Sequence, residues 1–417
     1  MTATNSAIIE IIVDQHFEEA SFLWSQRDAA VTDPHYDLQD LSRLDDRVEA
    51  HIDGLRVAGD HGWARCEEGM EEDDPGSVFT GSVIAFESGD GQRIEKVVKV
   101  GSESRTAFRG MVSGLGWLND HQFNSLIGQL VRANSGMYRR LGIAACGIRR
   151  IDPKTYLESA IQDADLFLKS RALRAVGELK RQDLLHLLLK DLQNEDHTCR
   201  FEAARSALLL GDHSALRSMG QFVQAPSSFR LPAMQIAFRV MDTQTSQNRL
   251  KALSKDPGNR RDVIMGMGIV GDPQYIPSLL KQMENPELAR VAGESFSMIT
   301  GVDLAYEDLE AEWPEGFEAG PNDDPEDEDV EMDLDEDLPW PEVELVKQWW
   351  AQHNGEFAKG IGYLASSPVS PEQCTQVLKN GFQRQRSAAA LALALAEPDM
   401  PYFNTCAPGF WQEKRLR

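Results

Sequence analysis

Small and apolar residues recur along the chain with a period of about thirty residues. Gly occupies the recurrent position in six of seven places, and successive steps are 31, 30, 34, 30, 30 and 30 residues. Mostly apolar residues stand four and one positions before each mark, on one face of a helix. The marks are Gly116, Gly147, Gly177, Gly211, Met241, Gly271 and Gly301.

Each mark is predicted to end a helix, because glycine fits a left-handed helix stop. Arg stands eleven residues before the mark in five of the seven units, at the expected beginning of the same helix. Asx-Pro pairs such as Asp272-Pro273 then open the next helix, since an Asx side chain caps free amides and proline suits the first helical position. Each unit is therefore predicted to be a helical hairpin.

A hairpin of this length cannot bury both apolar faces alone, so the units are expected to stack into a curved solenoid. Small residues five positions before the marks would permit close contact between inner helices: Gly142, Ala172, Ser206 and Gly266. A further unit is predicted around Gly89, where the spacing of Ile94, Val97 and Val98 favours helix over the alternative, a β-hairpin turning at 88–91.

Two amphipathic helices are predicted ahead of the repeats. The first spans residues 5–31, and the second begins after Pro34, carries an apolar stripe and stops at Gly59. These helices suit a cap that hides the end of a solenoid. The alternative is a docking surface for a partner, built around Arg43, Asp45, Arg47 and His51.

The rhythm breaks at residues 307–344. Between Glu307 and Asp337 there are 17 Asp or Glu residues and no Lys or Arg, so most of this insert is expected to be disordered and solvated. It would mimic an acidic ligand or act as a leash for a basic partner. The candidate partner-binding residues are Asp327, Glu328, Asp329, Asp333, Asp335 and Asp337.

Helices resume at residue 345, and an alanine-leucine run over 384–396 is expected to be buried in a closing hairpin rather than to lie on a membrane surface. The predicted organisation is a cap (1–75), a repeat solenoid (76–306), the acidic insert (307–344) and a C-terminal helical segment (345–417).

Charge and composition exclude several classes of function. The formal charge is -25, or -8 without the acidic stretch, which argues against a general binder of nucleic acid or anionic membranes. The five cysteines form no Cys-x-x-Cys pair and are expected to be reduced and mostly structural. No bilayer-length apolar stretch and no basic start of a secretory signal is found, so a cytoplasmic location is expected.

Catalytic motifs are absent from the sequence. There is no His-Glu-x-x-His pair, Gly-x-Ser-x-Gly elbow or phosphate-binding loop. We therefore predict no catalytic residues, no metal and no cofactor, and expect that the chain is not an enzyme.

Two resemblances bear on these patterns. Arg200 to Asp212 and Arg260 to Asp272 resemble the short HEAT-type repeats also seen in phycobilin lyases. Deoxyhypusine hydroxylase has similar repeats with His-Glu pairs for iron, but this chain has no His-Glu dipeptide, so that activity is not implied.

A second resemblance covers nearly the whole chain. The run from Asp40 to Gly59, with residues 16–28 before it and 383–390 far downstream, is similar to an uncharacterised proteobacterial family often encoded beside type VI secretion genes. That family has no established catalytic residues to carry over.

The prediction is thus an all-α protein, an α-solenoid of about seven 30-residue HEAT-like hairpins. Its expected function is a non-enzymatic protein-binding scaffold, an adaptor or chaperone associated with type VI secretion. The expected partner is a secretion effector or a component of the secretion machinery, with no nucleic acid and no membrane. The alternatives are an immunity protein that neutralises a cognate toxin, and a HEAT-like repeat enzyme or cofactor-binding protein.

Overall fold

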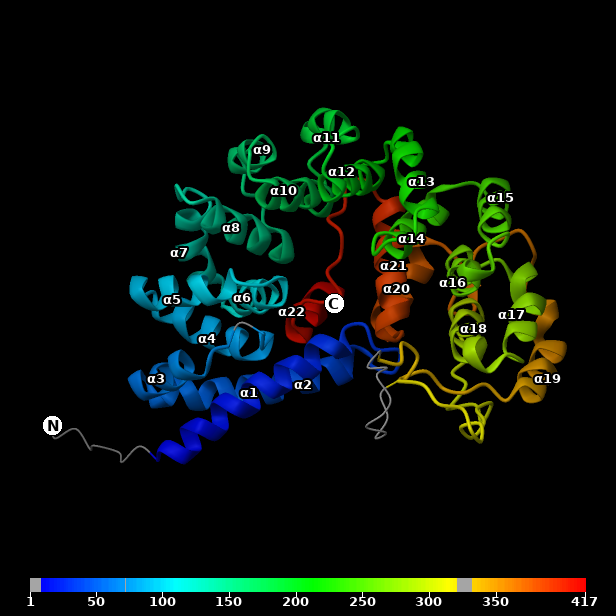
Figure 1. Ribbon diagram of the computed structural model, residues 1–417, viewed down its shortest axis with the longest axis horizontal. Helices are drawn as coiled ribbons and strands as arrows, with labels where there is room; N and C mark the ends of the chain where they lie inside the picture. Colours follow the sequence, from blue (N-terminus) through cyan, green and yellow to red (C-terminus); the bar gives the residue numbers. More distant parts are fainter. Residues whose placement is uncertain (1–8, 72, 321–331) are drawn as a thin grey trace. The chain divides into compact units, whose positions relative to one another are not determined.

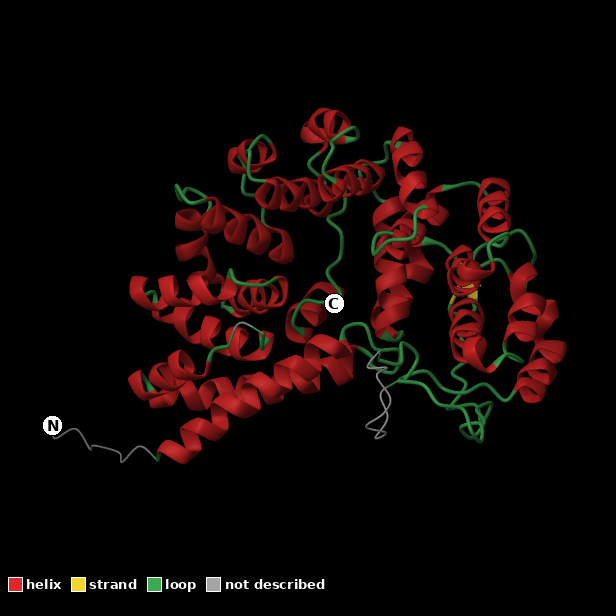
Figure 2. Cartoon of the chain, viewed as in Figure 1, coloured by secondary structure: helices red, strands yellow, loops and turns green. Residues whose placement is uncertain are grey.

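The computed structural model describes residues 9–71, 73–320 and 332–417, and it confirms the predicted all-α class (Figure 2). Within these ranges the one sheet consists of two short antiparallel strands, β1 (Tyr363–Leu364) and β2 (Ser367–Pro368). The chain forms two compact units. Unit 1 comprises Met1–Ala215 and Glu397–Arg417, and unit 2 comprises Leu216–Ala396.

Apart from the last one, at residues 409–416, the helices of unit 1 follow one another with short connections. They are α1 (Glu10–Ala30), α2 (Leu38–Ala58), α3 (Asp60–Gly69), α4 (Pro75–Ser88), α5 (Gly91–Gly101), α6 (Arg105–Trp117), α7 (Asp120–Leu130), α8 (Gly136–Arg149), α9 (Thr155–Ile161), α10 (Leu166–Leu179), η1 (Gln182–Leu184), α11 (Leu185–Asp191), α12 (His197–Leu209), η2 (His213–Ala215) and α22 (Gly409–Leu416).

Unit 1 is a stack of helical hairpins. Helices α4, α6, α8, α10 and α12 pack side by side and form what we call the inner layer, while α5, α7, α9 and α11 pack on them as a second layer (Figure 1). This is the arrangement expected when thirty-residue hairpins bury their second face against their neighbours. At the N-terminal end, α1 packs on α2 and α4.

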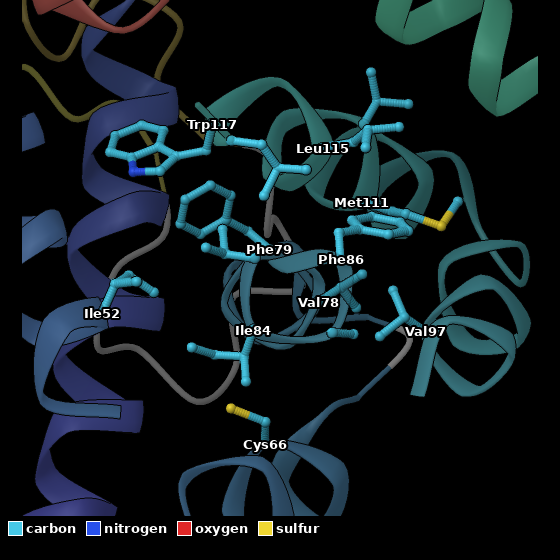
Figure 3. Close-up of a cluster of buried hydrophobic side chains, with 14 of the residues drawn as sticks. Ile52, Cys66, Val78, Phe79, Ile84, Phe86, Val97, Met111, Leu115 and Trp117 are labelled. Atoms are coloured by element: carbon cyan, nitrogen blue, oxygen red, sulfur yellow. The ribbon is translucent and has the colours of Figure 1, made fainter. Parts of the chain in front are cut away.

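The core at this end of unit 1 is centred on α4. Side chains from α2, α3, α4, α5 and α6 converge there, including Phe79, Met111 and Leu115, all fully buried (Figure 3). Phe79 stacks on Trp24 with ring centroids 5.0 Å apart and meets Trp117 edge-on at 5.2 Å. The extra hairpin predicted around Gly89 is therefore helical as expected, and Gly89 itself takes the left-handed conformation between α4 and α5.

Unit 2 repeats the hairpin pattern and adds a C-terminal hairpin. Its elements are α13 (Leu216–Gln224), α14 (Arg230–Val240), α15 (Thr243–Leu253), η3 (Pro257–Asn259), α16 (Arg260–Val270), η4 (Pro273–Tyr275), α17 (Ile276–Gln282), α18 (Pro286–Thr300), α19 (Val343–His353), η5 (Asn354–Glu356), α20 (Pro371–Asn380) and α21 (Gln383–Ala396). Helices α14, α16 and α18 pack in one layer, α13, α15 and α17 pack on them, and α21 packs on α14 and α20.

The repeated glycine has two different roles. At Gly271 and Gly301 it is the left-handed helix stop that the sequence predicts. At Gly116, Gly147 and Gly177 the prediction is wrong, because these residues lie inside α6, α8 and α10.

The three glycines inside helices mark close approaches instead. A Cβ built on Gly177 would lie 2.6 Å from Ser206 Oγ and 2.8 Å from Ser206 Cα, so only glycine lets α10 meet α12 at this distance. Helices α8 and α10 then end two residues later, and the residues that follow, Arg150 and Lys180, take the left-handed conformation.

Residues 345–417, predicted as one C-terminal helical segment, are divided between the two units. The expected hairpin is present as α20 and α21, and the alanine-leucine run is buried. From Glu397 onward the chain belongs to unit 1. Over the described residues, no helix combines the length and apolarity that crossing a membrane requires.

The close approach at Gly177 makes a testable prediction. Gly177→Ala should destabilise the chain by about 1–3 kcal/mol, because the added methyl group overpacks the contact with Ser206. Gly128 in α7 is the matched control, since its Cβ would meet nothing within 4 Å, and Gly128→Ala should stabilise by about 0.5–1 kcal/mol. Urea unfolding followed by circular dichroism gives both values. Equal effects at the two positions would contradict the packing role of Gly177.

Candidate functional site

The four residues predicted as a docking surface on α2 do not share one environment. Arg43 and Arg47 are exposed, and Arg43 pairs with Asp40 one turn earlier. His51 is half-buried, with its Nδ1 3.3 Å from Nδ1 of His16. Burial lowers the pKa of His51, and the neighbouring imidazole lowers it further.

Asp45 is the one member of this set that the structure removes from the surface. It is 1% exposed and accepts a hydrogen bond from Arg27 Nε at 2.8 Å. Its second carboxylate oxygen accepts the backbone N–H of Gly409. Burial raises the pKa of Asp45, and the Arg27 charge opposes that shift. The prediction of a partner-binding role for Asp45 is therefore wrong, because this carboxylate anchors the chain's own C-terminal segment.

The flanks of the acidic insert are packed in unit 2, contrary to the prediction of a largely solvated segment. Backbone hydrogen bonds from Ala311 N to Trp340 O and from Glu342 N to Leu309 O join the two flanks. Leu309, Leu338 and Trp340 are buried. A dense acidic composition predicted repulsion, but it could not show that these interspersed apolar residues reach a core.

Two carboxylates of the insert bind arginines of the repeats. Asp333 accepts two hydrogen bonds from Arg290, at 2.7 and 3.0 Å, and Asp335 accepts one from Arg261 Nη1 at 2.7 Å. Burial opposes ionisation of Asp333, but the bonds from Arg290 hold its pKa below the usual value. These two residues are therefore internal ligands, and the leash interpretation is wrong for them.

The remaining acidic candidates are placed as follows. Asp337 is exposed, whereas Asp327, Glu328 and Asp329 lie outside the described residues.

The aromatic rings of Trp313, Phe317 and Trp340 surround the Arg290 guanidinium, 4.8 to 5.9 Å from its central carbon.

The ion pair between Arg261 and Asp335 should stabilise unit 2 measurably. Arg261→Ala leaves a buried carboxylate without its partner and should destabilise unit 2 by about 3 kcal/mol. Arg260→Ala, next to it in the sequence but exposed, should change the free energy of unfolding by less than about 0.5 kcal/mol. Urea unfolding of the full chain checks both. A solvated insert would instead give two equally small effects.

The C-terminal segment, residues 397–417, lies on the inner layer of unit 1 (Figure 1). Its contacts with that layer are largely polar. The Tyr402 N–H donates to the Glu178 carbonyl at 3.1 Å, and Asn404 Nδ2 donates to the Ile148 carbonyl at 3.1 Å. Its helix α22 packs on α2.

Beneath Tyr402 is a group of charged side chains that we call the arginine cluster. It comprises four arginines around the buried carboxylate of Glu178: Arg150, Arg171, Arg174 and Arg205. These side chains come from the end of α8, from α10 and from α12, so three successive hairpins contribute. Glycine makes the space for them, since a Cβ on Gly147 would lie 2.6 Å from Glu178 Oε2.

Glu178 organises the cluster. Its Oε2 accepts from Arg171 Nη2 and its Oε1 from Arg174 Nε, each at 2.9 Å, and Arg150 Nη1 lies 3.7 Å away. Burial alone would raise the pKa of Glu178, but the arginine charges outweigh burial and hold the pKa well below its usual range. Burial also lowers the pKa of Arg150, to about 10.

The cluster carries more positive than negative charge. Its four guanidinium groups face two carboxylates, Glu178 and Glu202, and the nearest approach of Glu202 to Arg205 is 3.7 Å. Two guanidinium nitrogens, Nη1 of Arg171 and Nη1 of Arg205, are buried and make no hydrogen bond to the described residues. Nη1 of Arg205 is the atom paired with Glu202 Oε2 at 3.7 Å, and that oxygen also makes no hydrogen bond to the described residues. Arg174 is the most accessible member, with 49% of its side chain exposed.

Sequence reasoning missed this cluster, and the sequence carries only a regional signal of it. Residues 101–215 hold 16 Lys or Arg and 13 Asp or Glu, a formal charge of +3 in a chain of -25. A further arginine lies nearer to α6. The Arg140 guanidinium lies over the rings of Phe108 and Phe167, at 3.8 and 5.1 Å.

Unit 2 holds a smaller cationic feature. An open hollow of about 500 Å³ is lined by Arg217, Gly220, Gln221, Gln224, Ala225 and Arg249.

Over the ranges that the structure describes, no three His, Cys, Asp or Glu side chains are placed to hold a metal ion. The five cysteines are unpaired, and four of them are buried while Cys406 is exposed.

A scan against protein-family models found no match, and a search of curated proteins found none either.

The role of Glu178 predicts a pH-dependent stability difference. Glu178→Gln removes the buried anion from among four arginines and should destabilise unit 1 by about 3–5 kcal/mol at pH 7. Because the folded-state pKa is depressed, the stabilisation is fully present above the unfolded-state value of 4.5. It should shrink as the pH falls from there toward the lower folded-state pKa.

Urea midpoints measured from pH 7 down to pH 3 test this dependence. Glu195→Gln is the control, because Glu195 is exposed in the same unit and its removal should have little effect at any pH. A wild-type advantage over Glu178→Gln that stays constant down to pH 3 would contradict the assignment.

Proposed function

We propose that this chain is a non-enzymatic protein-binding scaffold that receives its partner on the inner layer of unit 1. The observation that supports this proposal is the arginine cluster, with its surplus of positive charge and two buried guanidinium nitrogens that make no hydrogen bond to the described residues. Buried donors of this kind are costly when unpaired, so a surface that carries them gains from being covered by a ligand with acceptors.

The extent of this surface favours a macromolecular partner over a small ligand. The arginine cluster and Arg140 together come from α8, α10 and α12. The inner layers of helical repeat stacks are the extended surfaces that such proteins use for binding. The charge of the whole chain, -25, opposes approach of a nucleic acid at long range. A protein partner with one short acidic segment fits both the extended surface and the negative charge of the whole chain.

The biological role that we propose follows from the second sequence resemblance. A family encoded beside type VI secretion genes supports an adaptor or chaperone in the cytoplasm, with a secretion effector or a component of the secretion machinery as its partner. An adaptor would hold effector and machinery together, whereas an immunity protein would bind a single toxin and block its active site.

Quantitative affinity capture from the host tests the scaffold and its surface together. Tagged full-length protein should retain a stoichiometric partner, and Arg174→Glu should lose most of it, because Arg174 is the exposed member of the cluster. The matched variant Arg43→Glu with Arg47→Glu reverses two exposed charges on α2 and should keep the partner. Mass spectrometry of each eluate gives the comparison.

Three results would overturn all or part of the proposal. Loss of the partner with the α2 variant and not with Arg174→Glu would move the docking surface to α2. Recovery of the bait alone, even after crosslinking, would count against a protein scaffold. Capture of one toxin alone, with no secretion component, would identify the chain as an immunity protein.

A further inference from the structure

The C-terminal segment is an incomplete occupant of the arginine cluster. Tyr402 lies over the cluster, with its ring 5.7 Å from the Arg150 guanidinium carbon and 5.6 Å from that of Arg205. It also supplies its carbonyl oxygen to Arg150 Nε. No acceptor of the described segment bonds to Nη1 of Arg171 or Arg205, so the segment leaves both donors without a hydrogen bond.

The segment is also electrically unsuited to the cluster. Residues 397–417 hold three acidic and three basic residues, so they bring no net negative charge to the surplus of arginines. Carboxylates are the better ligands, since their charge-assisted bonds to guanidinium are short, strong and often bidentate.

The stretch from Tyr402 to Asn404 is attached by contacts that a competing ligand can replace, whereas Gly409 stays anchored farther along by the buried Asp45. Thr405 and Gln412 are buried polar residues, while the large apolar Phe410 is 43% exposed. The contacts of the stretch from Tyr402 to Asn404 are hydrogen bonds and ring contacts to the ends of α8 and α10. Such contacts exchange for those of another chain more readily than a buried apolar core does.

From these observations we infer that the arginine cluster binds carboxylates of an acidic segment in the protein partner, and that this segment takes the place of Tyr402. The inference rests on the proposed scaffold function and names the chemistry of its partner. Aspartate or glutamate side chains spaced along an extended strand would reach Arg174, Arg171 and Arg205 in turn, completing the bonds that Nη1 of Arg171 and Nη1 of Arg205 lack.

The chain offers its own reporter of this exchange. Cys406 is the one exposed cysteine of the five, four residues beyond Tyr402, so a thiol-reactive fluorophore can be placed on the C-terminal segment selectively. The probe ligand is an acetylated octaglutamate peptide, titrated into full-length protein with the label and, by calorimetry, without it.

Octaglutamate should bind in a salt-sensitive manner and change the fluorescence at Cys406. Removing charge from the cluster with Arg174→Gln and Arg205→Gln together should weaken binding by about tenfold or more. Reversing two charges in the hollow of unit 2, with Arg217→Glu and Arg249→Glu, should leave the affinity unchanged within about twofold. Tyr402→Ala should strengthen binding several-fold, because it weakens the competing segment.

Several outcomes would overturn the inference. These are an affinity unaffected by the cluster variants, binding without a signal from Cys406, or weaker binding by Tyr402→Ala. Tighter binding of a single-stranded oligonucleotide of the same charge would assign the cluster to nucleic acid instead. Thermal unfolding of each variant shows whether it is folded, and Arg174→Gln alone serves if the double variant is not.

The two proposals fail separately. If octaglutamate binds the cluster but no host protein depends on Arg174, the site stands and the scaffold function fails. If a host protein depends on Arg174 but acidic peptides do not compete with it, the scaffold stands and the acidic chemistry is wrong.

Discussion

The close approach of neighbouring inner helices is the constraint on which unit 1 depends. A thirty-residue hairpin buries its second apolar face only against the next hairpin. The distance between the two hairpins is set by the size of the side chains at their contact. At Gly177 the neighbouring helix leaves no room for a methyl group beside Ser206. Glycine at this position thus serves the close packing, even though it weakens a helix interior.

The same spacing creates the chemistry of the inner layer. Where α8 meets α10, the absent side chain of Gly147 leaves the volume in which Arg171 and Glu178 lie. A carboxylate held there by arginines is strongly favoured in its ionised form. One buried anion therefore fixes several cations, and the surplus cations give an acidic chain a local basic face.

The structure closes two of its cationic sites with its own chain. In unit 2, Arg261 and Arg290 receive carboxylates from Asp335 and Asp333, and the bonds are short and direct. In unit 1, the C-terminal segment brings a carbonyl and an aromatic ring to the arginine cluster in place of a carboxylate. The contrast supports the proposal that the arginine cluster, rather than the site of Arg261 and Arg290, receives the carboxylates of a partner.

The sequence predicted what depends on local periodicity. The all-α class, the hairpin unit, the α2 stripe and the stops at Gly271 and Gly301 follow from positions close together in the chain. Contacts between distant segments were not predictable in this way. Asp45 meets Gly409 from 364 residues away, and Asp333 and Asp335 meet helices α18 and α16, so their composition suggested a solvent-facing role that the fold reverses.

Predicting the arginine cluster required knowing how the repeats align in space. Arg171, Arg174 and Glu178 share one helix and their pairing follows from helical spacing. Arg150 and Arg205 join them only because α8 and α12 pack on either side of α10. The glycine marks misled the prediction at Gly147 and Gly177, because a helix stop and a close approach favour the same residue.

Hydrogen–deuterium exchange of the full-length chain, with and without saturating octaglutamate, tests the central claim most directly. The Tyr402 amide is bonded to the Glu178 carbonyl, so displacement of the segment exposes a specific set of protected groups. We expect the peptide to accelerate exchange within residues 397–417 and to slow it in α10. Unchanged exchange in residues 397–417 while the peptide is bound would contradict the displacement of this segment by an acidic partner.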